Sequence, residues 1–217
     1  MIRVRATFEK KGRARYISHL DLNRCMLRIF RRSKLPIWYT EGFNPHPYYS
    51  FALALSLGFE SSCEIFDFNL TDDIPYNEIM ERLNSVMPEG MRIVNISEQK
   101  QKVTAITEAE YSFSLITKES DKLYSDIERL LSMNEILIDK KTKKGVQTVD
   151  IKPNIRIISC KKRDESVDMV IRLPAGTQTN LNPVLFIEAL KTSGCVSFDT
   201  GIIRREGIFC ENNEIFS

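Results

Sequence analysis

The sequence lacks the features that mark several classes of protein. It has no run of the roughly 20 apolar residues that a membrane-spanning helix needs. The longest apolar stretch, residues 51–59, is short and is interrupted by Ser56 and Gly58. Residues 1–6 alternate like a strand and carry no apolar signal-peptide core. We therefore expect a cytoplasmic protein that has no membrane partner.

Signatures of metal sites and of familiar enzymes are also missing. The five cysteines stand at wide spacings without a Cys-x-x-Cys pair, and the only histidines are His19 and His46. Neither a zinc site nor a disulfide framework is therefore indicated. Lys144-Gly145 lacks the upstream glycines of a phosphate-binding loop, and Gly-x-Ser-x-Gly is absent. We expect no cofactor and no metal, and the sequence favours a protein that is not an enzyme.

The charges that are present are distributed unevenly along the chain. The 217 residues include 31 Lys and Arg against 29 Asp and Glu, a formal net charge of +2. Residues 1–49 contain eleven basic and three acidic side chains, a net charge of +8, whereas residues 50–98 contain two and nine, a net charge of −7. The near-neutral total conceals a basic N-terminal segment, which indicates an anionic partner.

Hydrophobic periodicity predicts the elements of the first half. Ser18 and Asp21 resemble a capping box that starts a helix near His19, which Pro36 ends, and Asp73 is expected to cap a second helix. The strands are predicted at residues 2–9, 37–40, 50–57, 63–70 and 92–96. Residues 98–106 are polar and are typical of a linker.

The second half repeats this order of elements. Helices are predicted around Leu123–Leu131 and after Asn182-Pro183, and residues 140–145 form a basic turn. Strands are predicted at residues 111–116, 135–138, 154–160, 167–173, 195–198 and 202–209. The sequence therefore predicts an α+β fold of two tandem ferredoxin-like (β-α-β-β-α-β) units, with domains at residues 1–98 and 107–217.

The first predicted helix carries a stripe of arginines beside its apolar face. At 100° per residue, Arg24, Arg28, Arg31 and Arg32 fall together, and no acid at i±4 neutralises them. A guanidinium offers a planar fork of donors that suits phosphate. The basic candidates for nucleic-acid binding are Arg13, Arg15, Arg24, Arg28, Arg31, Arg32 and Lys34. The alternative is a solvated helix face that only keeps the protein soluble.

A second candidate is the loop that follows this helix, which we call the motif loop. Its aromatic side chains are suited to stacking on unpaired bases, and its prolines make it stiff. Its candidate residues are Tyr39, Glu41, Gly42, Phe43, Asn44, Pro45, His46, Pro47 and Tyr48. The alternative is that Phe43, Tyr48 and Tyr49 only plug the edge of the sheet. His19 and His46 are speculative catalytic residues, and a structural role is the alternative for His19.

The runs Arg15–Leu22 and Tyr39–Pro47, together with Leu55–Gly58, Glu64 and Val149–Pro153, resemble the uncharacterised bacterial radical SAM-linked protein family. The resemblance implies a partner, because members of that family are encoded beside, or fused to, a radical SAM protein. The chain has no Cys-x-x-x-Cys-x-x-Cys of its own. Its order of elements is also distantly similar to the CRISPR-repeat-processing RAMP endonucleases, which bind RNA.

Three hypotheses follow for the function. The first is a non-catalytic RNA-binding accessory protein that works with a radical SAM enzyme in RNA modification or processing. The second is a protein–protein adaptor for the radical SAM partner that binds no nucleic acid. The third is a metal-independent endoribonuclease that uses His19 and His46, which requires the two imidazoles to approach one another.

Overall fold

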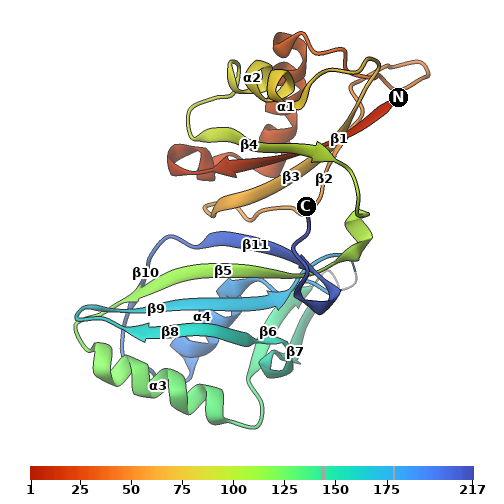
Figure 1. The fold of residues 1–217 in the computed structure, drawn as a ribbon. Coiled ribbons are helices and arrows are strands. Elements are labelled where there is room, and N and C mark those ends of the chain that lie inside the picture. Colours follow the sequence, from red (N-terminus) through yellow and green to blue (C-terminus); the bar gives the residue numbers. More distant parts are fainter. Residues whose placement is uncertain (143–144, 178) are drawn as a thin grey trace. The chain divides into compact units, whose positions relative to one another are not determined.

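The computed structural model describes residues 1–142, 145–177 and 179–217. The chain forms two compact units, one of Met1–Ile106 together with Arg204–Ser217 and one of Thr107–Ile203. Each unit combines helices with β-sheet (Figure 1), which confirms the α+β class. In the described part of the chain, no helix is both long and apolar enough to cross a membrane.

The first unit places two helices on a mixed sheet. Its elements are β1 (Ile2–Lys10), α1 (His19–Ser33), β2 (Tyr49–Phe51), β3 (Glu60–Leu70), α2 (Tyr76–Asn84), β4 (Met91–Glu98) and β11 (Arg204–Cys210). Strand β1 lies between β3 and β4 and is antiparallel to both. Strand β2 pairs antiparallel with the C-terminal part of β3, and β11 pairs parallel with its first residues.

Alternation along β1 and β3 sorts their side chains onto two faces. Helices α1 and α2 cover one of these faces (Figure 1). The core between helices and sheet contains Val4, Ala6 and Phe8 of β1, Phe66, Phe68 and Leu70 of β3, Leu22, Met26, Ile29 and Phe30 of α1, and Ile79 and Leu83 of α2. The opposite face carries polar residues of β1 and β3, among them Arg3 and Asn69, which face each other in register.

A buried ion pair on that polar face joins β1 to β3. Arg5 donates from Nε and Nη2 to the two carboxylate oxygens of Asp67, at 2.7 and 2.8 Å. The same guanidinium also donates to the backbone oxygens of Gln101 and Ser217, and it lies 4.1 Å from the ring centre of Phe216. Arg5 therefore fixes the C-terminal residues of the chain within the first unit.

The second unit contains a series of antiparallel strands, two helices and a separate hairpin. Its elements are β5 (Ile106–Ile116), α3 (Ser120–Ser132), β6 (Leu137–Thr142), β7 (Gly145–Asp150), β8 (Arg156–Lys162), β9 (Ser166–Pro174), α4 (Pro183–Thr192) and β10 (Asp199–Thr200). Strand β9 lies between β5 and β8, and β10 pairs with β5. Among the residues that the structure describes, strands β6 and β7 pair only with each other. Residues 143–144 of the predicted basic turn lie outside the described residues.

Several predicted elements of the first unit differ from the structure. Residues 37–40 form only isolated bridges, at Ile37 and Tyr39, and the strand expected at residues 50–57 is limited to β2. Asp73 does not cap α2, which begins at Tyr76 and has Pro75 at its N-cap. A proline disfavours helical geometry in the residue before it, so the helix starts later than the acidic pair suggests.

Two differences concern the end of the chain. Residues 195–198 are not a strand, and the short β10 follows them. The segment Arg204–Ser217, which the sequence predicts to be part of the second domain (residues 107–217), groups with Met1–Ile106 in the first unit. Two ion pairs to β3 account for this, because Arg204 pairs with Glu60 at 2.7 Å and the buried Arg205 pairs with Glu64 at 2.9 Å.

Candidate functional site

Helix α1 presents the arginines because its ends and its apolar face are well defined. The Ser18 hydroxyl accepts a hydrogen bond from the Asp21 N–H at 3.1 Å and donates to the Asp21 carboxylate at 2.8 Å, which confirms the predicted cap. The helix ends at Ser33, and Lys34 adopts a left-handed conformation with φ of 54°. Because the apolar stripe of α1 is buried in the core, the opposite face of the helix is exposed to solvent.

The exposed face of α1 carries three arginines that have no acidic partner. Arg28, Arg31 and Arg32 are exposed, and in the described ranges none of them forms an ion pair. Burial raises the pKa of the nearby Cys25 thiol, although Arg28 and Arg32 act in the opposite direction. We call Arg28, Arg31 and Arg32 the arginine face.

The expectation that the whole stripe lacks an acid is wrong for Arg24. Its Nη1 lies 3.0 Å from the Asp21 carboxylate, one turn earlier on the helix. Hydrogen bonds from Ser18 and Arg24 lower the pKa of the exposed Asp21 carboxyl below its ordinary value. The pair spans i and i+3, a spacing at which side chains also meet on a helix surface, so the i±4 rule does not detect it.

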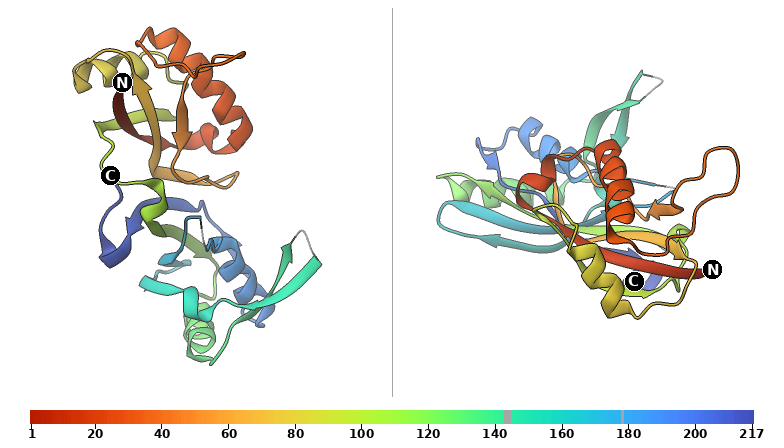
Figure 2. Two further views of the ribbon diagram at one scale, coloured as in Figure 1. Left: turned by 90° about the vertical axis from the view of Figure 1, so that its right-hand side faces the viewer. Right: turned by 90° about the horizontal axis from the view of Figure 1, so that it is seen from above.

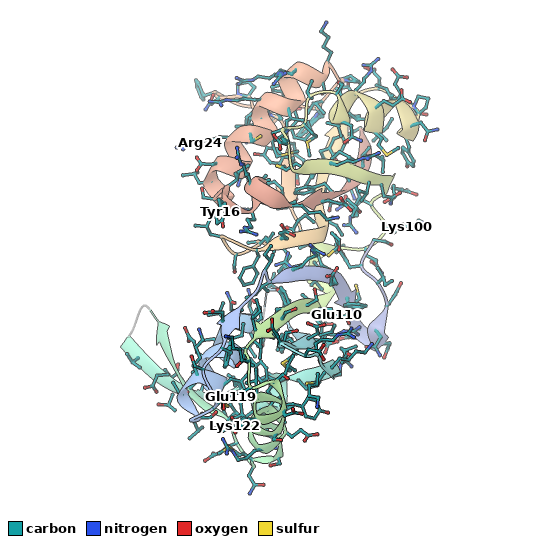
Figure 3. The ribbon with its side chains drawn as sticks, turned by 90° about the vertical axis from the view of Figure 1, so that its left-hand side faces the viewer. Tyr16, Arg24, Lys100, Glu110, Glu119 and Lys122 are labelled. Atoms are coloured by element: carbon teal, nitrogen blue, oxygen red, sulfur yellow. The ribbon has the colours of Figure 1, made fainter. Side chains whose placement is uncertain are left out.

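The other basic candidates lie at the two ends of α1. Arg13 is exposed in the 3₁₀ helix η1 (Gly12–Tyr16), and Lys34 is exposed after α1. Arg15 lies over the Tyr16 ring at 4.8 Å, and its Nη1 is 3.9 Å from Glu60. Tyr16 and Arg24 point outward on the same side of the first unit (Figure 3). The surface from η1 to the end of α1 is therefore basic, with one stacked and one paired arginine in it.

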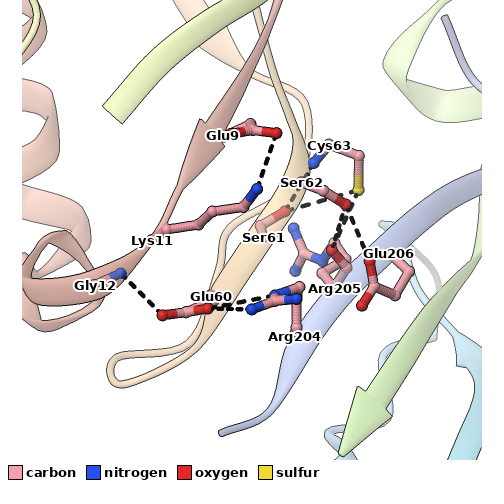
Figure 4. Close-up of polar contacts among 10 residues, drawn as sticks. All are labelled: Glu9, Lys11, Gly12, Glu60, Ser61, Ser62, Cys63, Arg204, Arg205 and Glu206. Carbon is pink, nitrogen blue, oxygen red and sulfur yellow. Dashed lines mark hydrogen bonds and ion pairs between the residues drawn. The ribbon is translucent and has the colours of Figure 1, made fainter. Parts of the chain in front are cut away.

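Only some of the acids in residues 50–98 pair with basic side chains of this surface. Glu60 accepts hydrogen bonds from the Gly12 N–H and from Arg204 (Figure 4). Burial raises the pKa of Glu60, but the hydrogen bonds from Arg204 and Gly12 outweigh it and hold that pKa below its usual value. The β3 acids Asp67, Glu60 and Glu64 thus pair with Arg5, Arg204 and Arg205, and no ion pair joins them to the arginine face in the described residues.

The motif loop is an irregular hairpin that projects from the first unit, as the orange loop in the right-hand view of Figure 2 shows. The Tyr48 N–H donates to the Trp38 carbonyl at 3.0 Å, and the Thr40 N–H donates to the His46 carbonyl at 2.9 Å. At its tip Gly42 has φ of 123°, a conformation that favours glycine. Glu41, Asn44 and Pro45 are also exposed there, whereas Pro47 is buried where the loop closes.

The aromatic residues of this region divide into two groups. Tyr49 belongs to β2, donates its hydroxyl to Asn23 and packs against Phe30, so for Tyr49 the plug interpretation fits. Phe43 is fully exposed, and Tyr39 and Tyr48 are more than two-fifths exposed. Such a group of aromatic rings without core contacts is available to bind a partner.

The structure gives each histidine local partners. His46 Nδ1 lies 3.1 Å from both Thr40 Oγ1 and the Asn44 carbonyl, so this ring closes the loop. The His19 ring packs edge-on against Phe51, with 5.4 Å between centroids. In the part of the chain that the structure describes, no hydrogen bond joins the two imidazoles, and no group of three His, Cys, Asp or Glu lies together to hold a metal ion.

A pocket of about 410 Å³ at the base of the motif loop was missed from the sequence. Its lining includes Arg3, Trp38, Tyr48, Asp67, Asn69 and Gln99. Two signals point to it in retrospect. The alternation of β1 places Arg3 on the face away from the core, and Trp38 is the single tryptophan of the chain.

Comparison with known families assigns the chain by sequence. A family model described as "Uncharacterized protein conserved in bacteria (DUF2344)" matches residues 3–183. The chain belongs to the DUF2344 family. The match takes in all the site residues predicted from the sequence, which lie between Arg13 and Tyr48. The expected link of this DUF2344 chain to a radical SAM protein stays a prediction.

Comparisons with individual proteins add little. No curated protein matches the chain. Among solved structures, a chain from the crystal structure of a Cbf5-Nop10-Gar1 complex is similar to it with a TM-score of 0.45 and 11% sequence identity. That likeness covers 96% of this chain and 50% of the other, so the DUF2344 chain spans about half the length of this neighbour.

Proposed function

We propose that this protein is a non-catalytic RNA-binding accessory protein that presents an RNA to a radical SAM enzyme. One observation carries the proposal. Arg28, Arg31 and Arg32 lie exposed on one face of α1 and have no acidic partner in the described part of the chain. Cations in this arrangement neutralise successive phosphates and release their counterions, which is the main source of affinity for a nucleic acid.

The motif loop supports RNA rather than double-stranded DNA as the ligand. Sequence-specific RNA recognition targets unpaired bases, which stack on aromatic side chains. Phe43, Tyr39 and Tyr48 offer exposed rings on a hairpin held closed by Thr40 and His46. In this proposal the arginine face holds the backbone and the loop contacts bases.

We also infer that each unit is ferredoxin-like, a fold from which RNA-binding surfaces are often built. In the first unit, β4, β1, β3 and β2 lie in that order, with α1 and α2 in the two crossovers. In the second unit the corresponding order is β10, β5, β9 and β8, with the β6–β7 hairpin inserted after α3. The antiparallel pairing of neighbouring strands in both series supports this inference.

The test is the affinity of the purified chain for short single-stranded RNA over a range of salt concentrations, measured by fluorescence anisotropy. We expect log K to fall linearly with log salt. Binding that is absent or insensitive to salt contradicts the proposal. A tight, RNA-free complex with the radical SAM partner, abolished when Arg28 and Arg31 are changed to Glu, would instead favour the adaptor hypothesis.

A further inference from the structure

The pocket at the base of the motif loop lies on the polar face of the first unit's sheet. Its lining residues Arg3, Asp67 and Asn69 alternate with the core residues of β1 and β3, so they point away from α1 and α2. The volume of about 410 Å³ is within the range of sites for small ligands, roughly 300–1,000 Å³. This pocket is therefore distinct from the arginine face.

One wall of the pocket is an aromatic pair on a well-anchored backbone. The rings of Trp38 and Tyr48 meet edge to face, with centroids 5.6 Å apart and an interplanar angle of 72°. The Trp38 N–H donates to the Asn69 carbonyl at 2.8 Å, and the Tyr48 N–H donates to the Trp38 carbonyl. The pair is thus tied to β3 and offers a pre-positioned surface for stacking.

Strand β1 provides the pocket with a cation that pairs with no acid among the described residues. Arg3 is exposed and, within the described ranges, forms no ion pair. Asp67 is the acid of the pocket, but Arg5 already occupies both of its carboxylate oxygens and Gln99 donates to one of them at 2.9 Å. The guanidinium of Arg3 therefore remains available for an anion. The Gln99 amide nitrogen already donates to Asp67 and the Asn69 amide nitrogen to the Met1 sulfur at 3.4 Å, so the side-chain oxygens of these two amides are the groups offered to a polar edge.

We propose that this pocket binds a nucleoside monophosphate unit, with its base on the Trp38–Tyr48 pair and its phosphate on Arg3. The face of an aromatic ring matches the base, the amide oxygens match donors on its polar edge, and the guanidinium of Arg3 matches the phosphate. The unit is a free nucleotide or one nucleotide of a bound RNA. In the second case the inference rests on the proposed function and adds a base-binding site to it.

Trp38 makes the test direct, because it is the only tryptophan. We expect saturable quenching of its fluorescence by at least one of AMP, GMP, CMP and UMP. Loss of a charge-assisted hydrogen bond predicts at least about tenfold weaker binding of the monophosphate in Arg3→Ala, while the affinity for the corresponding nucleoside stays the same. Arg3→Lys should restore part of the loss. Arg92→Ala is the matched control, because Arg92 is an exposed arginine of β4 outside the pocket.

The outcomes separate this inference from the proposed function. Displacement of the bound monophosphate by short RNA identifies an RNA nucleotide as the ligand, and failure to displace it identifies a free nucleotide. No quenching by any monophosphate or by RNA, or equal weakening by Arg3→Ala and Arg92→Ala, overturns the inference. If RNA still binds through the arginine face in that case, the proposed function stands. Quenching by a monophosphate without any RNA binding supports the pocket as a nucleotide site and contradicts the proposed function.

Discussion

Removal of the arginine face should change the salt dependence of RNA binding more than any other surface change of equal charge. The variant replaces Arg28, Arg31 and Arg32 with Ala. All three side chains are exposed on α1, and none has an ion partner in the described part of the chain. Their loss should therefore alter the free energy of unfolding only slightly, because exposed substitutions of this kind stay within about 0.5 kcal/mol each.

The magnitude follows from counterion release. Each phosphate neutralised on a single strand contributes about −0.7 to the slope of log K against log salt, so three lost contacts should make the slope shallower by about 2. The ratio of the wild-type RNA affinity to that of the variant should then be roughly 20-fold larger at about 50 mM than at about 200 mM salt. Anisotropy titrations with a labelled single-stranded RNA at four or five salt concentrations measure both slopes.

Two controls isolate the effect of the surface. Replacing Lys118, Lys161 and Lys191 of the second unit with Ala removes the same charge from other exposed positions, and the slope should barely change. Arg24→Ala should change it less than a single substitution in the arginine face, because Arg24 already pairs with Asp21. An unchanged slope in the arginine-face variant, or an equal change in the lysine variant, would show that the arginine face does not bind the RNA phosphates.

Further predictions concern stability, the motif loop and thiol reactivity. Arg5→Met leaves the buried Asp67 carboxylate without its ion-pair partner and should lower the free energy of unfolding by about 3–5 kcal/mol in urea titrations. A loss under about 1 kcal/mol would contradict the role of this pair. Ser18→Ala removes the cap of α1 and should cost about 1 kcal/mol by the same measurement; Ser18→Asn, which keeps a capping side chain, is the control. Phe43→Ala should leave stability unchanged but weaken RNA binding by about 1–3 kcal/mol, the contribution of one stacked base, and equal affinity argues against stacking. Burial raises the pKa of Cys63 to about 12, so this thiol should resist alkylation at pH 8 in the folded chain and react after unfolding; rapid labelling of native protein contradicts that.

The elements that the sequence predicted well are those with strong local signals. The alternation from Ile2 to Glu9 identified β1, and Ser18 with Asp21 identified the start of α1. Asn182 caps α4 as expected, because its side chain accepts from the Val184 N–H. In each case the signal is contained within a few consecutive residues, so no tertiary information is needed.

Features that depend on distant contacts were not predictable in the same way. The sequence cannot indicate that Arg205 pairs with Glu64, which brings β11 to the first unit. Nor does it place Trp38 beside Arg3, since their meeting depends on the Trp38 hydrogen bond to Asn69 and on the register of β1 with β3. Ion pairs have no sequence periodicity, and pocket walls come from segments far apart in the chain.

The decisive experiment is ultraviolet crosslinking in the native organism, followed by purification of the chain and identification of both its RNA and its protein partners. We expect RNA crosslinked to peptides of the motif loop, at Tyr39, Phe43 or Tyr48, and much less RNA recovered with the arginine-face variant. A radical SAM protein should be recovered in the same complex. Recovery of a protein partner without RNA, or RNA crosslinks confined to residues 107–203, would contradict this expectation.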